Sequence, residues 1–122
     1  MGETFFDFCL PLHAELMTTV RLTVGGLAAA AGLDVDAGED FKVCVTEALL
    51  VFKRNGFHKV NAHFDVKEGL KAVLTVDIST KENKNGDIED EISYALLGAL
   101  VDETAFEKNG ETITGITLKK SV

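Results

Sequence analysis

The chain has few basic residues: 12 lysines and arginines stand against 20 aspartates and glutamates, and the formal net charge is -8. This excess of negative charge repels nucleic-acid backbones and anionic membrane surfaces, so we do not expect nucleic acid as a partner. The chain also lacks any uninterrupted apolar run near the roughly 20 residues of a membrane-spanning helix, and its start does not resemble a signal peptide. We therefore expect no membrane association and a cytoplasmic location.

Cysteine is also scarce, because Cys9 and Cys44 are the two present and they do not form a Cys-x-x-Cys pair. Their placement in an expected strand and an expected helix favours buried, reduced thiols over a disulfide or a metal site. His13, His58 and His63 likewise show no metal-ligand spacing. The sequence thus predicts no resident metal.

What the chain does have is enough apolar sequence for one core. Its 122 residues are 46% hydrophobic, and this length is too short for two ordinary domains. We find no internal repeat and no low-complexity tract. Residues 1–122 are therefore expected to form a single domain.

Apolar periodicity and turn residues predict strands and helices in a clear order. An aspartate cap at Asp34 or Asp36 begins the second helix, which runs to about Arg54. The order predicts an α+β two-layer sandwich with three helices on one face of a mixed, largely antiparallel sheet. The expected strands cover residues 4–10, 59–66, 70–79, 105–108 and 112–119, and the other expected helices cover residues 14–31 and 88–100.

Two details of the helices carry further expectations. The adjacent glycines Gly25 and Gly26 in the first helix indicate either a close approach by a neighbouring element or a local kink. The third helix has an apolar stripe that we expect to be its buried face. That stripe consists of Ile92, Leu96, Ala99 and Leu100.

The second helix contains the most informative pair of residues, Glu47 and Val51. Residues four apart in a helix lie on the same face, so these two side chains share one space. A lone carboxylate beside a valine can accept hydrogen bonds or act as a base, but it has no second oxygen ligand to hold Mg²⁺. Glu47 is either a catalytic base or an acid at the edge of a buried helix that is solvated or salt-bridged.

Several segments, together about half of the chain, stand in the order found in one protein family. They resemble the anti-sigma factor serine kinases of the RsbW and SpoIIAB type, which are GHKL (Bergerat-fold) ATPases. The resemblance implies a Bergerat fold, a homodimer, and a sigma factor or anti-anti-sigma factor as partner. The segments are residues 10–11 (LP), 20–24 (VRLTV), the alanine-rich stretch ending in 32–33 (GL), 39–48 (EDFKVCVTEA) and 95–103 (ALLGALVDE).

The family's ATP-binding residues are mostly missing at the matching positions. The resemblance places the family's acid at Glu47, but Val51 stands where an asparagine would bind Mg²⁺. Asp77 is the candidate for the aspartate that reads adenine, yet no glycines follow it. Residues 89–93 (EDEIS) supply carboxylates where a glycine-rich loop would hold phosphates, and about ten residues, 80–89, remain for the ATP lid.

Arg21 matches an arginine in the family's first helix, on the side that meets a sigma factor or a partner subunit. It is either an interface anchor or a charged residue on a solvated helix face. Asn55 is either a displaced metal ligand or, more simply, a helix terminator.

These features predict a regulatory protein-binding module that resembles an anti-sigma factor, works without a cofactor and does not bind ATP productively. One alternative is an Mg-ATP-dependent anti-sigma factor serine/threonine protein kinase with an atypical site, in which Glu47 is the base. A second alternative is a small-ligand binding domain that reuses the former nucleotide pocket, lined by Val43, Leu50 and Val51.

Overall fold

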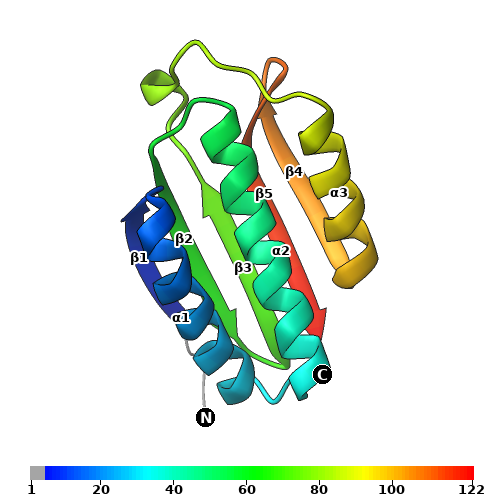
Figure 1. Ribbon diagram of the computed structural model, residues 1–122. Helices are drawn as coiled ribbons and strands as arrows, with labels where there is room; N and C mark the ends of the chain where they lie inside the picture. Colours follow the sequence, from blue (N-terminus) through cyan, green and yellow to red (C-terminus); the bar gives the residue numbers. More distant parts are fainter. Residues whose placement is uncertain (1–4) are drawn as a thin grey trace.

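The structure, a computed structural model, describes residues 5–122. In this part of the chain, five strands form one sheet in the order β1-β2-β3-β5-β4, and all neighbouring strands are antiparallel. Three α-helices cover one face of that sheet (Figure 1). The elements are β1 (Phe5–Pro11), η1 (Ala14–Leu16), α1 (Met17–Ala30), α2 (Val35–Arg54), β2 (Lys59–Val66), β3 (Gly69–Thr75), η2 (Ile78–Thr80), α3 (Ile88–Leu100), β4 (Glu103–Asn109) and β5 (Thr112–Ser121).

This architecture confirms the predicted α+β two-layer sandwich and is consistent with a Bergerat-like fold. The sheet, predicted to be mixed and largely antiparallel, is antiparallel at every pair of neighbouring strands in the described residues. The predicted start of the first strand, Thr4, lies outside the described residues. None of the helices in the described chain is long and apolar enough to cross a membrane.

The sheet buries one face against the helices and leaves the other open. On β2, four alternate side chains are buried and the residues between them are exposed or half-buried, as a half-buried strand requires. The register places Leu10 of β1 beside Val60 and Leu74 of β3 beside Ala62, so the buried rows continue across the strands. The buried β2 residues are Val60, Ala62, Phe64 and Val66.

The central helix, α2, lies between α1 and α3 and is the most buried of the three (Figure 1). Its cap is Asp34, whose Oδ1 accepts a hydrogen bond from the amide of Ala37 at 2.8 Å. Phe41 and Phe52 are fully buried on its core side. The prediction of this helix, including one of its two proposed caps, is confirmed.

The third strand is shorter than predicted, because β3 ends at Thr75 and not at residue 79. Asp77 instead caps the short 3-10 turn η2, and its Oδ1 accepts hydrogen bonds from the Ser79 amide at 3.0 Å and hydroxyl at 2.7 Å. Such local side-chain bonds compete with strand pairing. The first predicted helix similarly begins with the 3-10 turn η1 before α1 starts at Met17.

The predicted buried face of α3 was wrong in part, because Leu96 and Leu100 are half-buried but Ile92 and Ala99 are exposed. Ile92 is 59% exposed, whereas Asp90, Ser93 and Leu97 are 6%, 2% and 0% exposed. The helix is therefore rotated relative to its apolar stripe, and two polar residues face α2. Apolar periodicity missed this orientation because it assigns polar side chains to solvent, and here their partners lie on a neighbouring helix.

The two cysteines differ in their surroundings, and both are free. Cys44 is fully buried, and burial, helped by the nearby Asp40 carboxylate, raises the pKa of its thiol to about 11. Cys9 is exposed, which corrects the expectation of two buried thiols. It pairs with Asn61 on the open face of the sheet.

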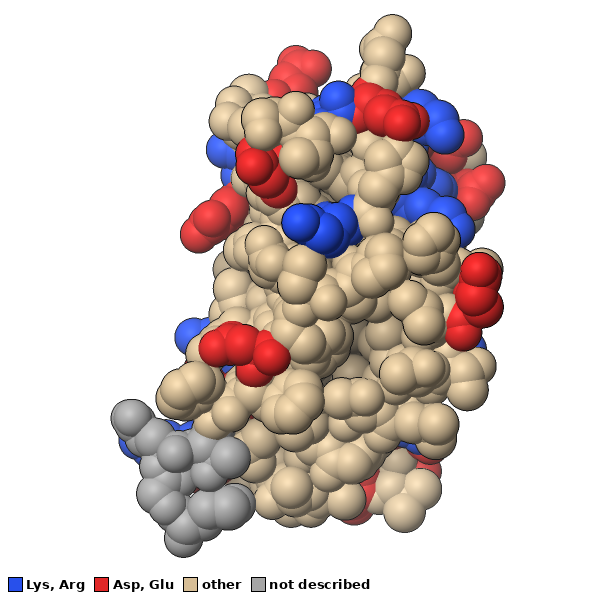
Figure 2. Space-filling view, turned by 90° about the vertical axis from the view of Figure 1, so that its left-hand side faces the viewer, with Lys and Arg blue, Asp and Glu red and all other residues tan. Residues whose placement is uncertain are grey.

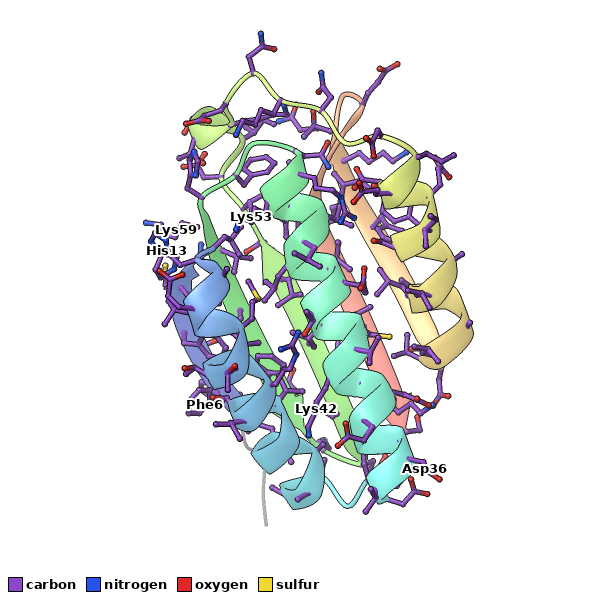
Figure 3. The ribbon with its side chains drawn as sticks, viewed as in Figure 1. Phe6, His13, Asp36, Lys42, Lys53 and Lys59 are labelled. Atoms are coloured by element: carbon purple, nitrogen blue, oxygen red, sulfur yellow. The ribbon has the colours of Figure 1, made fainter. Side chains whose placement is uncertain are left out.

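The glycine pair in α1 is explained by a close approach. A Cβ atom at Gly25 would lie 2.8 Å from the Cε of Lys42, while one at Gly26 would meet nothing within 4 Å. The Lys42 side chain extends from α2 toward α1 (Figure 3). Of the two interpretations of this pair, the close approach by a neighbouring element applies at Gly25.

Candidate functional site

The resemblance assigns roles to four residues: Arg21, Glu47, Val51 and Asp77. The structure brings two of them together. Arg21 of α1 and Glu47 of α2 line one hollow of about 230 Å³ between these helices, together with Lys42 and Thr46. Arg21 is exposed and Glu47 is half-buried. Val51 lies one turn farther along α2 and is only 1% exposed, and Asp77 lies in the separate turn η2.

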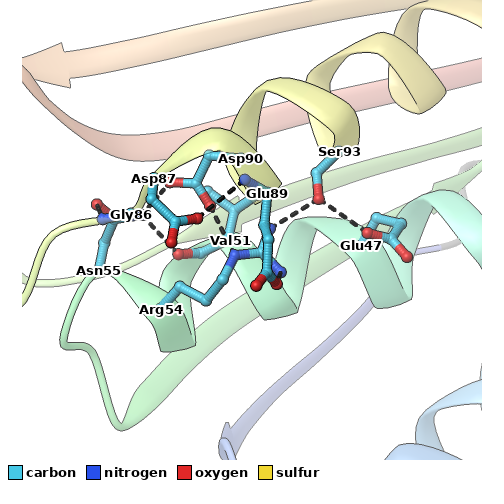
Figure 4. A network of polar contacts seen from close by, with 9 residues as sticks. All are labelled: Glu47, Val51, Arg54, Asn55, Gly86, Asp87, Glu89, Asp90 and Ser93. Carbon is cyan, nitrogen blue, oxygen red and sulfur yellow. Dashed lines mark hydrogen bonds and ion pairs between the residues drawn. The ribbon is translucent and has the colours of Figure 1, made fainter.

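Glu47 belongs to a chain of hydrogen bonds that joins α2 to α3. Its Oε2 accepts from the hydroxyl of Ser93 at 2.8 Å, and that hydroxyl oxygen accepts from Nη2 of Arg54 at 2.7 Å. Arg54 also donates from Nε to Oδ1 of Asp90 at 2.7 Å. Figure 4 shows these side chains meeting in the space between the two helices.

Asn55, directly after α2, completes this group. Its Nδ2 donates to Oδ2 of Asp90 at 2.7 Å and to the carbonyl of Val51 at 2.8 Å, while its Oδ1 accepts from the amide of Gly86 at 2.8 Å. The side chain thus ties the end of α2 to the loop that precedes α3. We call Glu47, Arg54, Asn55, Gly86, Asp90 and Ser93 the α2–α3 network (Figure 4).

The network is internally satisfied and partly shielded from solvent: Asp90 and Ser93 are buried, and its other four members are half-buried. The Asp90 side chain is 9% exposed and its partner Arg54 is 22% exposed, so this ion pair is shielded from solvent far more than a surface pair. No buried side-chain nitrogen or oxygen in residues 5–122 lacks a hydrogen-bond partner. Asp90 therefore acts as an acceptor for α2, and not as part of an exposed acidic cluster.

Gly86 makes room for the Asp90 carboxylate. A Cβ atom at Gly86 would lie 1.5 Å from Oδ2 of Asp90 and 2.8 Å from Nδ2 of Asn55. The loop backbone and the carboxylate consequently pack so closely that no other residue fits at this position without displacing the network.

The carboxylates of residues 89–93 lie inside α3, and not in a loop before it, which corrects their assignment to the phosphate-loop position. Asp87 is the helix cap, and its Oδ1 accepts from the amide of Glu89 at 2.9 Å. The start of α3, where free amides would favour an anion, therefore carries its own acids.

Asp77 is fully exposed to solvent. The hydroxyl and amide of Ser79 donate to its carboxylate, and these bonds lower the pKa of Asp77 below its usual value. Ser79 and Thr80, which donate hydrogen bonds to Asp77, belong to the same turn, and Asp77 does not line the hollow that contains Arg21 and Glu47.

The three residues of the expected small-ligand pocket do not share an open cavity. Val43 is 42% exposed and lines the hollow between α1 and α2, while Val51 is buried. Leu50 is half-buried on the same helix. The valine at the expected metal-ligand position thus contributes to the hydrophobic core instead of lining an empty site.

Sequence reasoning missed Arg54 as a site residue, and it did not predict that Arg54 and Asn55 pair with Asp90 and Ser93. A signal was present, because Arg54 follows Glu47 by seven residues and Ser93 follows Asp90 by three, which places each pair on one helix face. The pairing between the two helices required the three-dimensional arrangement.

The chain is similar to known serine-protein kinases. It is 27% identical over 135 residues to the serine-protein kinase RsbW of Staphylococcus aureus strains JH9 and Newman, an alignment that covers 92% of this chain and 85% of the relative. No protein-family model matches the chain. The similarity shows a likeness to RsbW proteins over most of the chain. It agrees with the fold and with the resemblance noted in the sequence.

The alignment also indicates a difference in length. The aligned stretch of 135 residues is longer than this whole chain of 122 residues, so the RsbW relatives contain residues with no counterpart here.

Proposed function

We propose that this protein is an anti-sigma-factor-like regulator that acts by binding protein partners and does not bind ATP productively. The observation that carries the proposal is the α2–α3 network. The resemblance assigns the nucleotide's metal and phosphates to the position between α2, which carries Glu47, and the last helix, α3. The network occupies this position with side chains of the protein itself.

The residues present do not fit Mg-ATP. A hydrated Mg²⁺ needs oxygen ligands, and Val51 offers none and is buried. A triphosphate needs free cations and amides, but Arg54 is bonded to Asp90 and Ser93, and the Gly86 amide donates to Asn55. The extra carboxylates at the start of α3 add repulsion.

The short connection before α3 supports the same proposal. A lid that closes over a nucleotide needs a flexible segment of some length. Here η2 and the loop that follows it join β3 to α3. Asn55 ties this loop to the end of α2 by accepting a hydrogen bond from the Gly86 amide, and Lys81 bonds to carbonyls within the loop.

The proposed partners are a sigma factor or an anti-anti-sigma factor in the cytoplasm, with Arg21 as a contact residue. Arg21 is exposed beside a hollow that is open to solvent, and arginine is enriched in protein interfaces. The test is to measure the affinity for purified sigma factors of the same genome with and without Mg-ATP. We expect equal affinities, and a requirement for Mg-ATP would contradict the proposal.

A second candidate is a serine/threonine protein kinase, which is favoured by the printed name of the RsbW relatives. Glu47 would then be the base, because its carboxylate lines the open hollow beside Arg21. Transfer of phosphate from ATP to a serine of an anti-anti-sigma factor, lost in Glu47→Gln, would support this candidate over the first.

We also propose that the protein forms a homodimer through the β1–α1 face. Figure 2 shows that this side of the molecule is largely uncharged, although the net charge is -8. An apolar groove of about 210 Å³ runs between the edge strand β1 and α1. Two acidic copies repel each other least where neither carries charge. The groove is lined by Phe6, Phe8, Leu10, Leu16, Thr19, Val20 and Thr23.

Phe6 provides the test of this dimer. It is 46% exposed and lies at the groove (Figure 3), so Phe6→Glu places one negative charge from each copy in the interface. We expect the dissociation constant measured by sedimentation equilibrium to rise at least tenfold, which corresponds to about 1.4 kcal/mol. The matched control is Val35→Glu, at a residue that is 80% exposed at the start of α2. This change should leave the dissociation constant of the dimer unchanged. A monomeric parent chain would contradict the proposal.

A further inference from the structure

The open face of the sheet carries a cluster of two carboxylates and one imidazole. Asp7 of β1 stands directly opposite His63 of β2 in the strand register, and Asp65 follows His63 by two residues on the same face. Nδ1 of His63 is hydrogen-bonded to Oδ1 of Asp7, and Nε2 lies 3.2 Å from Oδ2 of Asp65. Both ring nitrogens therefore face an acid.

The remaining neighbours of the imidazole are an aromatic ring, a valine, a lysine and a cysteine. The ring of Phe5 stacks on it at a centroid distance of 5.7 Å, and Val73 of β3 is its partner on the other side. Lys71 of β3 stands opposite Asp65, and Cys9 lies two residues beyond Asp7 on β1. Asp7, Cys9 and His63 line a hollow of about 390 Å³, so water and protons reach the ring.

We propose that Asp7, His63 and Asp65 form a proton-controlled clasp that determines how firmly the edge strand β1 is held on the sheet. A protonated imidazole donates from both nitrogens and bridges the two carboxylates. A neutral imidazole has one N–H, so it faces one of the acids with a lone pair. Loss of the proton also removes the positive charge that faces the Asp7 carboxylate, so it weakens the link between β1 and β2 whichever nitrogen keeps its hydrogen.

The position of the cluster makes this weakening local. β1 is an edge strand, and β2 is its one neighbour in the sheet. The contact between His63 and Asp7 crosses from β2 to β1, whereas the contact between His63 and Asp65 stays within β2. The clasp therefore acts on the attachment of β1 and leaves the other strands of the sheet unaffected. This inference goes beyond the proposed function and does not depend on it.

The direction of the pH effect follows from the geometry. The hydrogen bond to Asp7, with the nearby charges of Asp7 and Asp65, raises the pKa of His63 above its ordinary value of 6.5. A raised pKa in the folded state means that the stabilisation is fully present below the ordinary pKa and is lost as the pH rises through the folded-state pKa. β1 is accordingly held most firmly at mildly acidic pH.

The experiment measures hydrogen exchange of the β1 amides by NMR on the full chain at mildly acidic and mildly alkaline pH, corrected for the intrinsic exchange rates. We expect the protection of β1 to fall about two- to fivefold at the higher pH, the range for a solvent-exposed ion pair. The amides of β4, the other edge strand, serve as the internal reference. The NMR titration of His63 should give a pKa above 6.5.

Two variants separate the clasp from a general effect of pH. Asp7→Asn removes the contact that crosses between the strands and should abolish the difference between β1 and β4. Asp65→Asn keeps that contact and should preserve the difference. Equal pH profiles in the parent chain and Asp7→Asn, or a His63 pKa at or below 6.5, would overturn the proposal.

Discussion

The variant Arg54→Met is expected to lose about 3 kcal/mol of unfolding free energy, because removing one partner of a buried ion pair leaves the other charge uncompensated. Asp90 would keep its bond to Asn55 but lose the Arg54 guanidinium in a place where its side chain is 9% exposed. Ser93 would lose a donor as well. Chemical denaturation of the two proteins measures the difference.

The neighbouring residue provides the control. Lys53 is exposed on the same turn of α2, and Lys53→Met removes an equal charge. Its effect should stay within about 0.5 kcal/mol, as for ordinary surface substitutions. If Arg54→Met were as mild as Lys53→Met, the α2–α3 network would contribute little to the fold. The proposal that this network occupies the nucleotide position would then be wrong.

The second large effect concerns two glycines near α3, whose replacement by alanine should act in opposite directions. Gly86→Ala places a Cβ atom 1.5 Å from the Asp90 carboxylate, so the loop or Asp90 must move. We expect a loss of about 1–3 kcal/mol, the range for an overpacked site or a buried polar group left without its partner. The melting temperature should fall accordingly.

Gly98→Ala is the matched comparison. Gly98 lies inside α3, and a Cβ atom there would meet nothing within 4 Å. Because alanine favours helix more than glycine does, this change should stabilise the protein by about 0.5–1 kcal/mol. Equal responses of the two variants would show that space at Gly86 is not limiting.

Much of the fold could be predicted from local sequence, because each element has its own signal. The cap at Asp34 and the alternation along residues 59–66 predicted α2 and β2, and both are confirmed. The end of β3 was missed because the side chain of Asp77 bonds to its own turn, and strand alternation does not reveal that bond.

The candidate site could be predicted only in part. Glu47 and Val51 were located from helical spacing, but their surroundings depend on how α3 is rotated. That rotation is determined by Arg54 and Asn55, which pair with a carboxylate 35 or more residues away in sequence. Periodicity arguments treat Asp90 and Ser93 as solvent-facing, and long-range pairing of polar groups is therefore what the sequence alone did not reveal.

The most direct test of the proposal that the α2–α3 network occupies the nucleotide position is a titration of the purified chain with Mg-ATP, followed by thermal unfolding. A nucleotide present at a hundred times its dissociation constant would stabilise the fold by about 2.7 kcal/mol. The account predicts no rise in melting temperature at millimolar Mg-ATP, because Arg54 and Asn55 both already bond to Asp90. A saturable rise that requires magnesium would contradict it.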